Sequence, residues 1–174
     1  MTEAARILQL SADLGAVLQA QRLLLATAES CTGGGVGFAV TQIAGSSAWF
    51  DRGFVTYSNE AKQQMLGVPA ATLRAHGAVS EAAARAMALG ALARSAARVA
   101  VAVTGIAGPG GGTRAKPAGT VWFAWALQRA RSHALTVIAE RHRFDGDRAA
   151  VRAQSIVVAL DGLLRLVGEV RRTR

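Results

Sequence analysis

Ser30 stands at a point in the chain where a nucleophile can be placed. It follows the short apolar run 23–26 and begins a glycine-rich turn that contains Thr32, Gly33 and Gly34. A serine at a strand-to-helix turn exposes its hydroxyl, and the main-chain N–H groups of the next residues can stabilise an oxyanion beside it. The same pattern is typical of a serine that caps a helix N-terminus, so both interpretations stay open at this point.

A nucleophilic serine needs a base, and Lys62 is the candidate. Lysine serves as a base when desolvation lowers its pKa enough to keep it neutral, whereas arginine stays protonated. Among its 20 basic residues the chain uses lysine only at Lys62 and Lys116. Tyr57 is predicted to end a strand and Lys62 to lie in the first turn of the next helix, so the two form a candidate pair. The alternative for Lys62 is an ordinary surface lysine whose stem packs along the protein.

Cys31 is the rival nucleophile. A lone cysteine flanked by small residues is more often a small buried hydrophobe, and no histidine partner stabilises its thiolate. One cysteine and three scattered histidines offer no metal-ligand spacing, so we expect neither a metal nor a cofactor, and a Ser-His-Asp triad is poorly supported. The single cysteine also favours a reducing cytoplasm. The histidines are His76, in a loop, and His133 and His142, at the surface.

A second glycine-rich segment, residues 104–119, follows a predicted strand and begins with Thr104 and Gly105. Ligands of α/β sheets bind beyond the carboxyl ends of parallel strands, so this segment and residues 29–35 are expected to face one crevice. Glycines there allow main-chain N–H groups to approach an anion closely. Neither segment matches a Walker A or a GxGxxG fingerprint, and a tight turn is the alternative interpretation.

The elements that must position these residues alternate along the chain. Apolar periodicity predicts five helices and five strands, with a hairpin formed by the last two strands. We expect a three-layer α/β/α sandwich with a mixed, about five-stranded sheet, in a single domain that spans residues 1–174. Asn59 is the predicted N-cap of the helix that carries Lys62, and Trp122 and Trp125 are expected in the core on opposite sides of a strand. The predicted helices are 2–21, 36–43, 60–66, 80–97 and 147–170, and the strands are 22–27, 50–58, 99–103, 120–127 and 135–144.

Composition excludes several classes of protein. The chain has 174 residues, 51% of them hydrophobic, and a formal charge of +9. It is too apolar for disorder, has no apolar run of the roughly 20 residues that a bilayer span requires, and begins without the pattern of a signal peptide. The positive charge suits an anionic ligand. Apart from the cluster at residues 171–174, the arginines are spread singly, so we do not expect nucleic acid as a partner, and an Ala-rich chain of this size suits a homodimer.

Five strings in this order closely resemble the CinA C-terminal domain family, over about residues 5–165. They are Ala28-Glu29-Ser30-Cys31-Thr32-Gly33-Gly34, Gly53-Phe54-Val55-Thr56-Tyr57-Ser58-Asn59-Glu60-Ala61-Lys62, His76-Gly77-Ala78-Val79-Ser80, Thr104-Gly105-Ile106-Ala107-Gly108-Pro109 and Lys116-Pro117-Ala118-Gly119-Thr120-Val121.

The resemblance implies hydrolysis of nicotinamide mononucleotide to nicotinate mononucleotide and ammonia, which recycles pyridine nucleotides for NAD synthesis. It implies a Ser/Lys amidohydrolase without a metal requirement, with Ser30 as nucleophile, Lys62 as general base and Tyr57 as assisting residue. Arg148 joins Lys116 and the glycines 108–112 as a candidate anchor for the phosphate. The expected substrate-binding residues are Thr32, Gly33, Gly34, Thr104, Gly105, Gly108 and Lys116.

Two departures from the family accompany the resemblance. Ala118 replaces the valine usual at its position, which should leave the chemistry unchanged. The nucleotide-binding domain that precedes this region in longer CinA proteins is not expected, and neither is its pyrophosphatase activity. The alternative function is a non-catalytic nucleotide- or nucleic-acid-binding protein linked to competence or DNA damage. A steep dependence of DNA binding on salt would favour that alternative.

Overall fold

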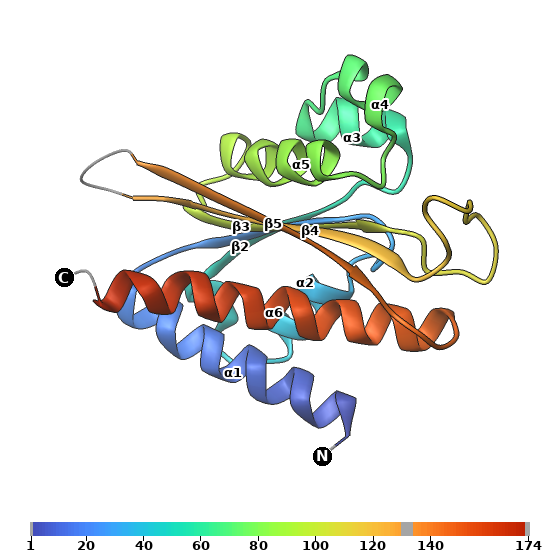
Figure 1. Cartoon of the computed structure of the whole chain (residues 1–174). Coiled ribbons are helices and arrows are strands. Elements are labelled where there is room, and N and C mark those ends of the chain that lie inside the picture. The colour runs from blue at the N-terminus through green and yellow to red at the C-terminus, as the bar shows by residue number, and fades with distance from the viewer. Residues whose placement is uncertain (1, 130–133, 173–174) are drawn as a thin grey trace.

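A mixed five-stranded sheet forms the centre of the computed structural model, which describes residues 2–129 and 134–172 (Figure 1). The strand order is β2-β1-β3-β4-β5. β1 runs parallel to β2 and β3, whereas β4 runs antiparallel to β3 and β5. The strands are β1 (Leu25–Glu29), β2 (Phe50–Val55), β3 (Val99–Gly105), β4 (Thr120–Gln128) and β5 (Leu135–Arg143).

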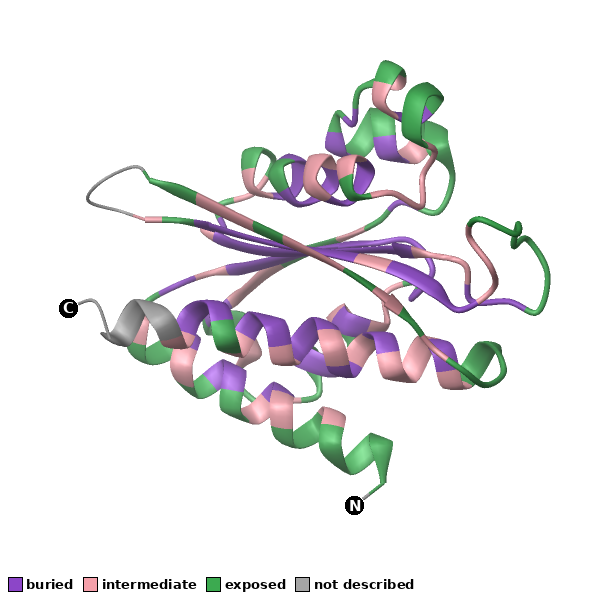
Figure 2. Ribbon diagram, viewed as in Figure 1, coloured by how far each residue is buried: buried purple, intermediate pink, exposed green. Residues whose placement is uncertain are grey.

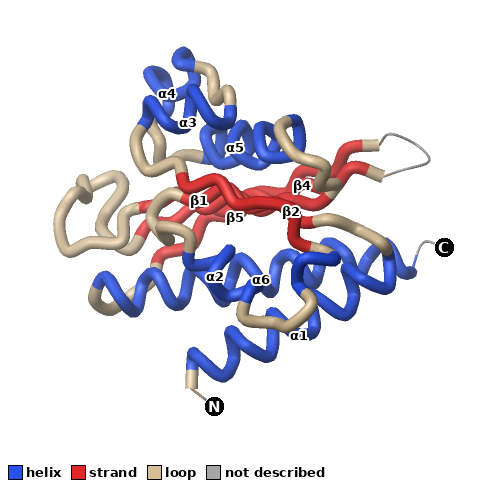
Figure 3. The backbone as a smooth tube through the Cα atoms, turned by 180° about the vertical axis from the view of Figure 1, so that it is seen from behind, coloured by secondary structure: helices blue, strands red, loops and turns tan. Residues whose placement is uncertain are grey.

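Helices cover both faces of the sheet, which confirms the predicted α/β/α sandwich. One face carries α1 (Glu3–Gln21), α2 (Gly35–Thr41) and α6 (Arg148–Arg172). The other carries α5 (Glu81–Ala93), with α3 (Asn59–Leu66) and α4 (Ala70–His76) packed beside it. A short 3-10 helix, η1 (Ser46–Ala48), precedes β2. The same two groups of helices separate cleanly when the molecule is seen from behind (Figure 3).

The two faces of the sheet carry side chains of different size because successive residues of a strand point to opposite sides. Toward α1, α2 and α6 the strands present large residues, among them Val101, Phe123 and Trp125. Toward α5 the buried residues of β1, β3 and β4 are alanines, and those of α5 are also mostly small. Figure 2 shows the three central strands, β1, β3 and β4, as the most continuously buried part of the sheet. The alanine set is Ala26, Ala28, Ala100, Ala102, Ala124 and Ala126 in the strands, with Ala83, Ala84, Ala88 and Ala91 in α5.

This alanine layer brings the helices close to the sheet and to one another. A Cβ atom at Gly90 of α5 would collide with the main-chain carbonyl of Leu66, so α3 approaches α5 at a position that only glycine permits. α3, the helix that carries Lys62, is therefore held at a fixed height above the sheet.

Trp122 and Trp125 lie on opposite sides of β4, as predicted. Trp125 is buried in the core of large residues, where its Nε1 donates to the Ala159 carbonyl at 2.9 Å. Trp122 packs against the alanine layer. Both tryptophans thus contribute to packing rather than to a ligand surface.

Several element boundaries differ from the prediction. β1 begins at Leu25 because Arg22 adopts a left-handed conformation (φ 54°) and ends α1. Ser58, not Asn59, caps α3, since its side chain accepts the Ala61 N–H at 3.0 Å. α4 was not predicted, and α5 ends at Ala93 rather than at residue 97. The β4–β5 hairpin is confirmed, although His133 lies outside the described residues. Within the described ranges, no helix is long and apolar enough to cross a membrane.

Candidate active site

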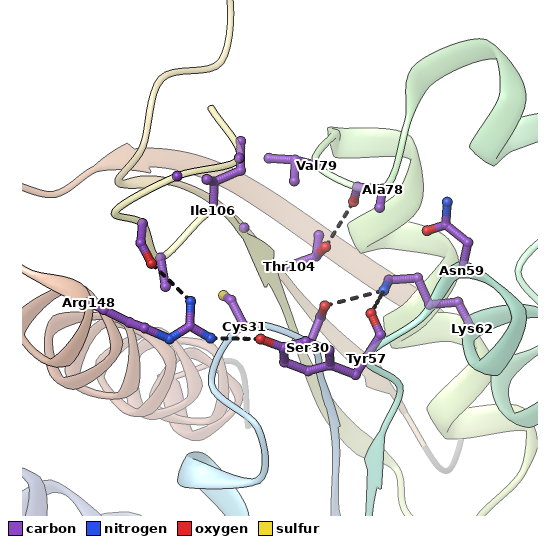
Figure 4. A pocket seen from close by; sticks show the side chains of 15 residues that line it. Ser30, Cys31, Tyr57, Asn59, Lys62, Ala78, Val79, Thr104, Ile106 and Arg148 are labelled. Atoms are coloured by element: carbon purple, nitrogen blue, oxygen red, sulfur yellow. Dashed lines mark hydrogen bonds between the residues drawn. The ribbon is translucent and has the colours of Figure 1, made fainter. Parts of the chain in front are cut away.

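A cavity of about 280 Å³ opens at the carboxyl ends of β1, β2 and β3, where the sequence predicts a crevice (Figure 4). β1 connects to β2 through α2 on one face of the sheet, whereas β2 connects to β3 through helices on the other face. The chain thus leaves β1 toward one neighbouring strand and returns to the other, and ligands of α/β sheets bind at such a topological switch point. Its lining residues are Ser30, Cys31, Tyr57, Asn59, Lys62, Ala78, Val79, Thr104, Gly105, Ile106, Ala107, Gly108, Gly110, Gly111 and Arg148.

Ser30 is the first residue after β1. Its main-chain N–H donates to the Val103 carbonyl at 2.9 Å, so the turn remains attached to the sheet. The Gly33 N–H donates to the Ser30 carbonyl at 3.0 Å, and Gly33 and Gly34 take positive φ values of 59° and 91°. This tight turn places the serine side chain in the cavity and occupies one of the N–H groups expected to face an oxyanion.

The Glu29 carboxylate holds the turn that follows Ser30, and this role was not predicted from the sequence. The residue is 1% exposed, and its two carboxylate oxygens accept the N–H groups of Val36 at 2.9 Å and Gly37 at 2.8 Å. These donors belong to the first turn of α2, whose N-terminal N–H groups lack partners within the helix. The carboxylate thus joins the end of β1 to the start of α2, with Ser30 on the turn between them. An acid this far ahead of a helix fits no local capping pattern, and no signal in the sequence marks its role.

Lys62 Nζ is buried beside Ser30. It lies 3.2 Å from Ser30 Oγ, 2.9 Å from the Thr56 carbonyl oxygen and 3.3 Å from that of Tyr57. Lys62 is the fourth residue of α3, and the Ser58 side chain caps this helix. The cap fixes the start of α3 relative to the end of β2. In the neutral amine, two N–H groups donate to the carbonyls and the lone pair faces the serine hydroxyl.

The surroundings of Lys62 favour the neutral form. Burial lowers the pKa of Lys62 below its ordinary value of 10.5 because desolvation penalises the charged ammonium. Among the described residues, no carboxylate forms an ion pair with it. A buried lysine without an acidic partner is suited to accept a proton.

Tyr57 contributes two different groups. Its main-chain carbonyl contacts Lys62, whereas its hydroxyl accepts a hydrogen bond from Arg148 Nη2 at 2.7 Å. Arg148 is the first residue of α6, and its Nη1 donates to the Gly108 carbonyl at 3.0 Å. The guanidinium therefore joins the end of β2 to the glycine-rich segment, and Figure 4 shows it beside the cavity.

Thr104, Gly105 and Gly108, three of the expected substrate-binding residues, line the cavity. Thr104 Oγ1 donates to the Ala78 carbonyl at 2.8 Å. A Cβ at Gly105 would lie 2.8 Å from the Thr120 carbonyl oxygen of the neighbouring strand, so glycine allows the tight pairing there. These contacts bring the walls of the cavity together at its base.

Four other predicted substrate-binding residues do not line this cavity. Thr32 is fully buried, and Arg152 Nη2 donates to its carbonyl at 2.9 Å. Gly33 and Gly34 form the turn behind Ser30. Lys116 Nζ donates to the His76 carbonyl at 2.8 Å, which directs the ammonium to the end of α4. The turn and this lysine thus lie outside the lining of the cavity, and their expected role in binding the substrate stays a prediction.

Cys31 lines the cavity, but its surroundings favour a small buried hydrophobic residue over a nucleophile. It is 5% exposed, and burial raises the pKa of its thiol to about 11, so the reactive thiolate is scarce at neutral pH. Neither His76 nor His142 lines the cavity, and His142 Nε2 lies 3.0 Å from Glu140 Oε2. In the part of the chain that the structure describes, no three His, Cys, Asp or Glu side chains gather as a metal site requires.

Known proteins resemble this chain over most of its length. The sequence matches the model of the CinA C-terminal domain over residues 7–167. Nicotinamide-nucleotide amidohydrolase PncC of Pseudomonas putida is 52% identical over 160 residues, which cover 92% of this chain and 96% of that protein. The protein of the same name from Escherichia coli strain K12 is 54% identical over 157 residues, or 90% of this chain and 92% of that protein.

Solved structures resemble the fold closely. Competence/damage inducible protein CihA from Agrobacterium tumefaciens superposes with a TM-score of 0.86 at 46% identity, covering 92% of this chain and 95% of that one. A CinA superfamily protein from Klebsiella pneumoniae 700603 also superposes with a TM-score of 0.86, at 41% identity, covering 94% and 98%.

Proposed function

The chain belongs to the CinA C-terminal domain family, and we propose that it is a nicotinamide-nucleotide amidohydrolase. It hydrolyses the carboxamide of nicotinamide mononucleotide to nicotinate mononucleotide and ammonia, in the recycling of pyridine nucleotides. The relatives named PncC support this activity through 52% and 54% identity over most of both chains. The observation that carries the proposal is the buried Lys62 Nζ at 3.2 Å from Ser30 Oγ.

The first chemical step is attack by Ser30. Neutral Lys62 accepts the hydroxyl proton as Ser30 Oγ forms a bond to the amide carbon, and the carbonyl electron pair moves onto the oxygen. The Thr56 and Tyr57 carbonyls hold two hydrogens of the amine away from the serine. This arrangement keeps the lone pair in line with the proton that it takes.

The oxyanion needs a nearby donor. The Gly33 N–H is already bonded to the Ser30 carbonyl, so we assign the role to the N–H of Cys31, which directly follows the nucleophile and belongs to the cavity lining. A main-chain donor next to the nucleophile is a recurring solution in serine hydrolases.

The tetrahedral intermediate then collapses. The C–N bond breaks, the ammonium of Lys62 returns its proton to the departing nitrogen, and ammonia leaves a nicotinoyl ester on Ser30. A water molecule, deprotonated by the now neutral Lys62, attacks this ester. The ester C–O bond to Ser30 then breaks, Lys62 returns the proton to Ser30 Oγ, and the acid is released. Protons and electrons balance over the two halves of the reaction, and Lys62 is regenerated in its neutral form.

Arg148 is our candidate for the group that binds the phosphate. It lines the cavity and also an adjoining cavity of about 580 Å³ formed with the start of α6. A guanidinium offers paired donors to a phosphate. By holding the Tyr57 hydroxyl, the same residue links phosphate binding to the strand end that contacts Lys62.

Ammonia release from nicotinamide mononucleotide tests the proposal. We expect release by the purified protein in the presence of a chelator and its loss, by at least about a thousandfold, in Ser30→Ala. Near-normal activity of folded Ser30→Ala would rule out the serine mechanism, and no release by folded wild-type protein would rule out the activity.

Two further expectations stay predictions. The homodimer can be checked by light scattering of the purified protein at several concentrations. The cytoplasmic location, inferred from the single cysteine, can be checked by fractionating cells that express the tagged chain.

A further inference from the structure

Two hydrogen bonds join the end of α4 and the residues that follow it to β3 and the loop after it. Residues 77–79 lie between α4 and α5, and the glycine-rich loop (residues 106–119) lies between β3 and β4. At the base of the cavity, Thr104 Oγ1 donates to the Ala78 carbonyl at 2.8 Å. Outside it, Lys116 Nζ donates to the His76 carbonyl, also at 2.8 Å. Val79 and Ile106 line the cavity from these two segments, and Figure 4 shows both above Ser30.

We infer that Lys116 is a positioning residue, which holds the glycine-rich loop at the end of α4 and so sets the width of the substrate cavity. Its kinetic effect rests on the proposed amidohydrolase function, whereas its effect on the loop does not. This role differs from direct binding of the substrate phosphate, because Lys116 does not line the cavity.

The local structure on both sides favours the hydrogen bond between Lys116 Nζ and the His76 carbonyl. The Thr113 N–H donates to the Lys116 carbonyl at 2.9 Å, and the Lys116 N–H donates to Thr113 Oγ1 at 3.1 Å, which closes a tight turn around the lysine. The acceptor is the carbonyl of the last residue of α4, a group that lacks a partner within the helix. Gly77 follows at φ 74°, and a Cβ there would lie 3.5 Å from Lys116 Nζ.

A single lysine contact matters here because the loop has few other restraints. Gly108, Gly110 and Gly111 line the cavity, and glycines lose more conformational freedom on ordering than any other residue. Without the lysine, the loop must become ordered when the substrate binds, which weakens binding. Ser30 and Lys62 are held by β1 and α3, so the rate of the chemical step is expected to be unaffected.

Arg114 provides a matched control. It lies two residues from Lys116 in the same loop, is exposed, and forms no hydrogen bond or ion pair with any residue that the structure describes. Arg114→Met and Lys116→Met each remove one positive charge from the loop, but only the second removes the contact with α4. Arg114 is also the one site in the loop that trypsin can cut, because Lys116 precedes Pro117.

The experiment combines limited trypsin digestion of the free protein with steady-state kinetics on nicotinamide mononucleotide. For Lys116→Met we expect cleavage after Arg114 to accelerate at least about fivefold and KM to rise about three- to tenfold, with kcat within about twofold of wild type. Lys116→Arg, which retains a donor, should restore both values, and Arg114→Met should keep KM within about twofold.

Unchanged cleavage in Lys116→Met would overturn the inference, and a rise in KM without faster cleavage would assign the lysine to the substrate instead. Faster cleavage with a fall in kcat at unchanged KM would also overturn it. If the wild-type protein does not hydrolyse the nucleotide, the proposed function fails, and the digestion still decides whether Lys116 holds the loop.

Discussion

Lys62 Nζ lies 3.2 Å from Ser30 Oγ while the carbonyl oxygens of Thr56 and Tyr57 contact the same nitrogen. A protonated ammonium uses its three hydrogens on these three oxygens. The neutral amine keeps the two carbonyl contacts and turns its lone pair to the serine. The same geometry therefore serves the resting base and the protonated intermediate, so proton transfer requires no movement of the lysine.

Replacement of Lys62 by arginine separates charge from basicity. Arginine keeps the positive charge but stays protonated, so it cannot take the Ser30 proton. We expect Lys62→Arg to lower kcat at least about a thousandfold while the far-UV circular dichroism spectrum is unchanged. Lys116→Arg makes the same exchange at the other lysine and should retain activity. Activity of folded Lys62→Arg within tenfold of wild type would exclude Lys62 as the base.

The buried lysine should make stability depend on pH. Burial lowers the pKa of Lys62 in the folded state below 10.5, its ordinary value. Between these two pKa values the unfolded chain binds more protons, so the free energy of unfolding rises with pH in this window. Urea unfolding at pH 7 to 10 should show this rise relative to Lys62→Met.

Both proteins in that comparison should carry Cys31→Ala. The pKa of Cys31 is raised from 9.0 to about 11, which makes stability fall as pH rises through that interval. Removing the thiol leaves the lysine as the difference between the two proteins. Equal slopes with and without Lys62 would show that burial does not perturb its pKa.

Replacement of Cys31 distinguishes the two candidate nucleophiles. Because the thiol is buried and protonated at neutral pH, we expect Cys31→Ala to retain kcat within about threefold. Iodoacetamide should alkylate the folded wild-type protein much more slowly than the urea-unfolded protein, as measured by mass spectrometry. Loss of activity in folded Cys31→Ala comparable to that of Ser30→Ala would assign the nucleophile to the cysteine.

Much of the fold was predictable because its determinants are local. Apolar periodicity and turn residues located the five strands and most of the helices, and the parallel start of the sheet brought Ser30, Tyr57 and Thr104 to one edge. Ser30 and Lys62 emerged from spacing as candidates with open alternatives, and the family resemblance supplied their roles. The missed features join distant segments: the Arg148–Tyr57 hydrogen bond spans 91 positions and the Lys116–His76 contact spans 40.

Glu29 should affect catalysis through the turn that it supports. Glutamine at this position has one acceptor oxygen where the carboxylate has two, so either the Val36 or the Gly37 N–H loses its partner. We expect Glu29→Gln to lose about 1–3 kcal/mol of unfolding free energy and to lower kcat about tenfold or more, with a smaller change in KM. Glu60→Gln, at an exposed glutamate of α3, is the control. A purely structural Glu29 would lower stability and leave kcat of the folded fraction unchanged.

Tyr57 and Arg148 should act as one unit. Their side chains share a 2.7 Å hydrogen bond beside the cavity, and residues in one network show non-additive effects. Tyr57→Phe and Arg148→Met are each expected to lower kcat/KM about tenfold or more, and the double variant should lose little beyond the worse single variant. Fully multiplicative losses would mean that the tyrosine hydroxyl and the guanidinium act independently.

The alanine layer beneath α5 makes the reaction sensitive to residues that no substrate can touch. Ser30 directly follows β1 and Lys62 lies in α3, which packs against α5 at Gly90, while small residues of α5 such as Ala88 and Ala91 pack with the alanines of the sheet. The size of these side chains sets how far α3 lies from the sheet, and therefore the distance between Ser30 Oγ and Lys62 Nζ. One added methylene there would widen a proton-transfer distance without altering any group that lines the cavity. Selection on catalysis would then constrain the size of side chains deep in the core, and sequence variation at these alanines would reflect turnover as much as stability.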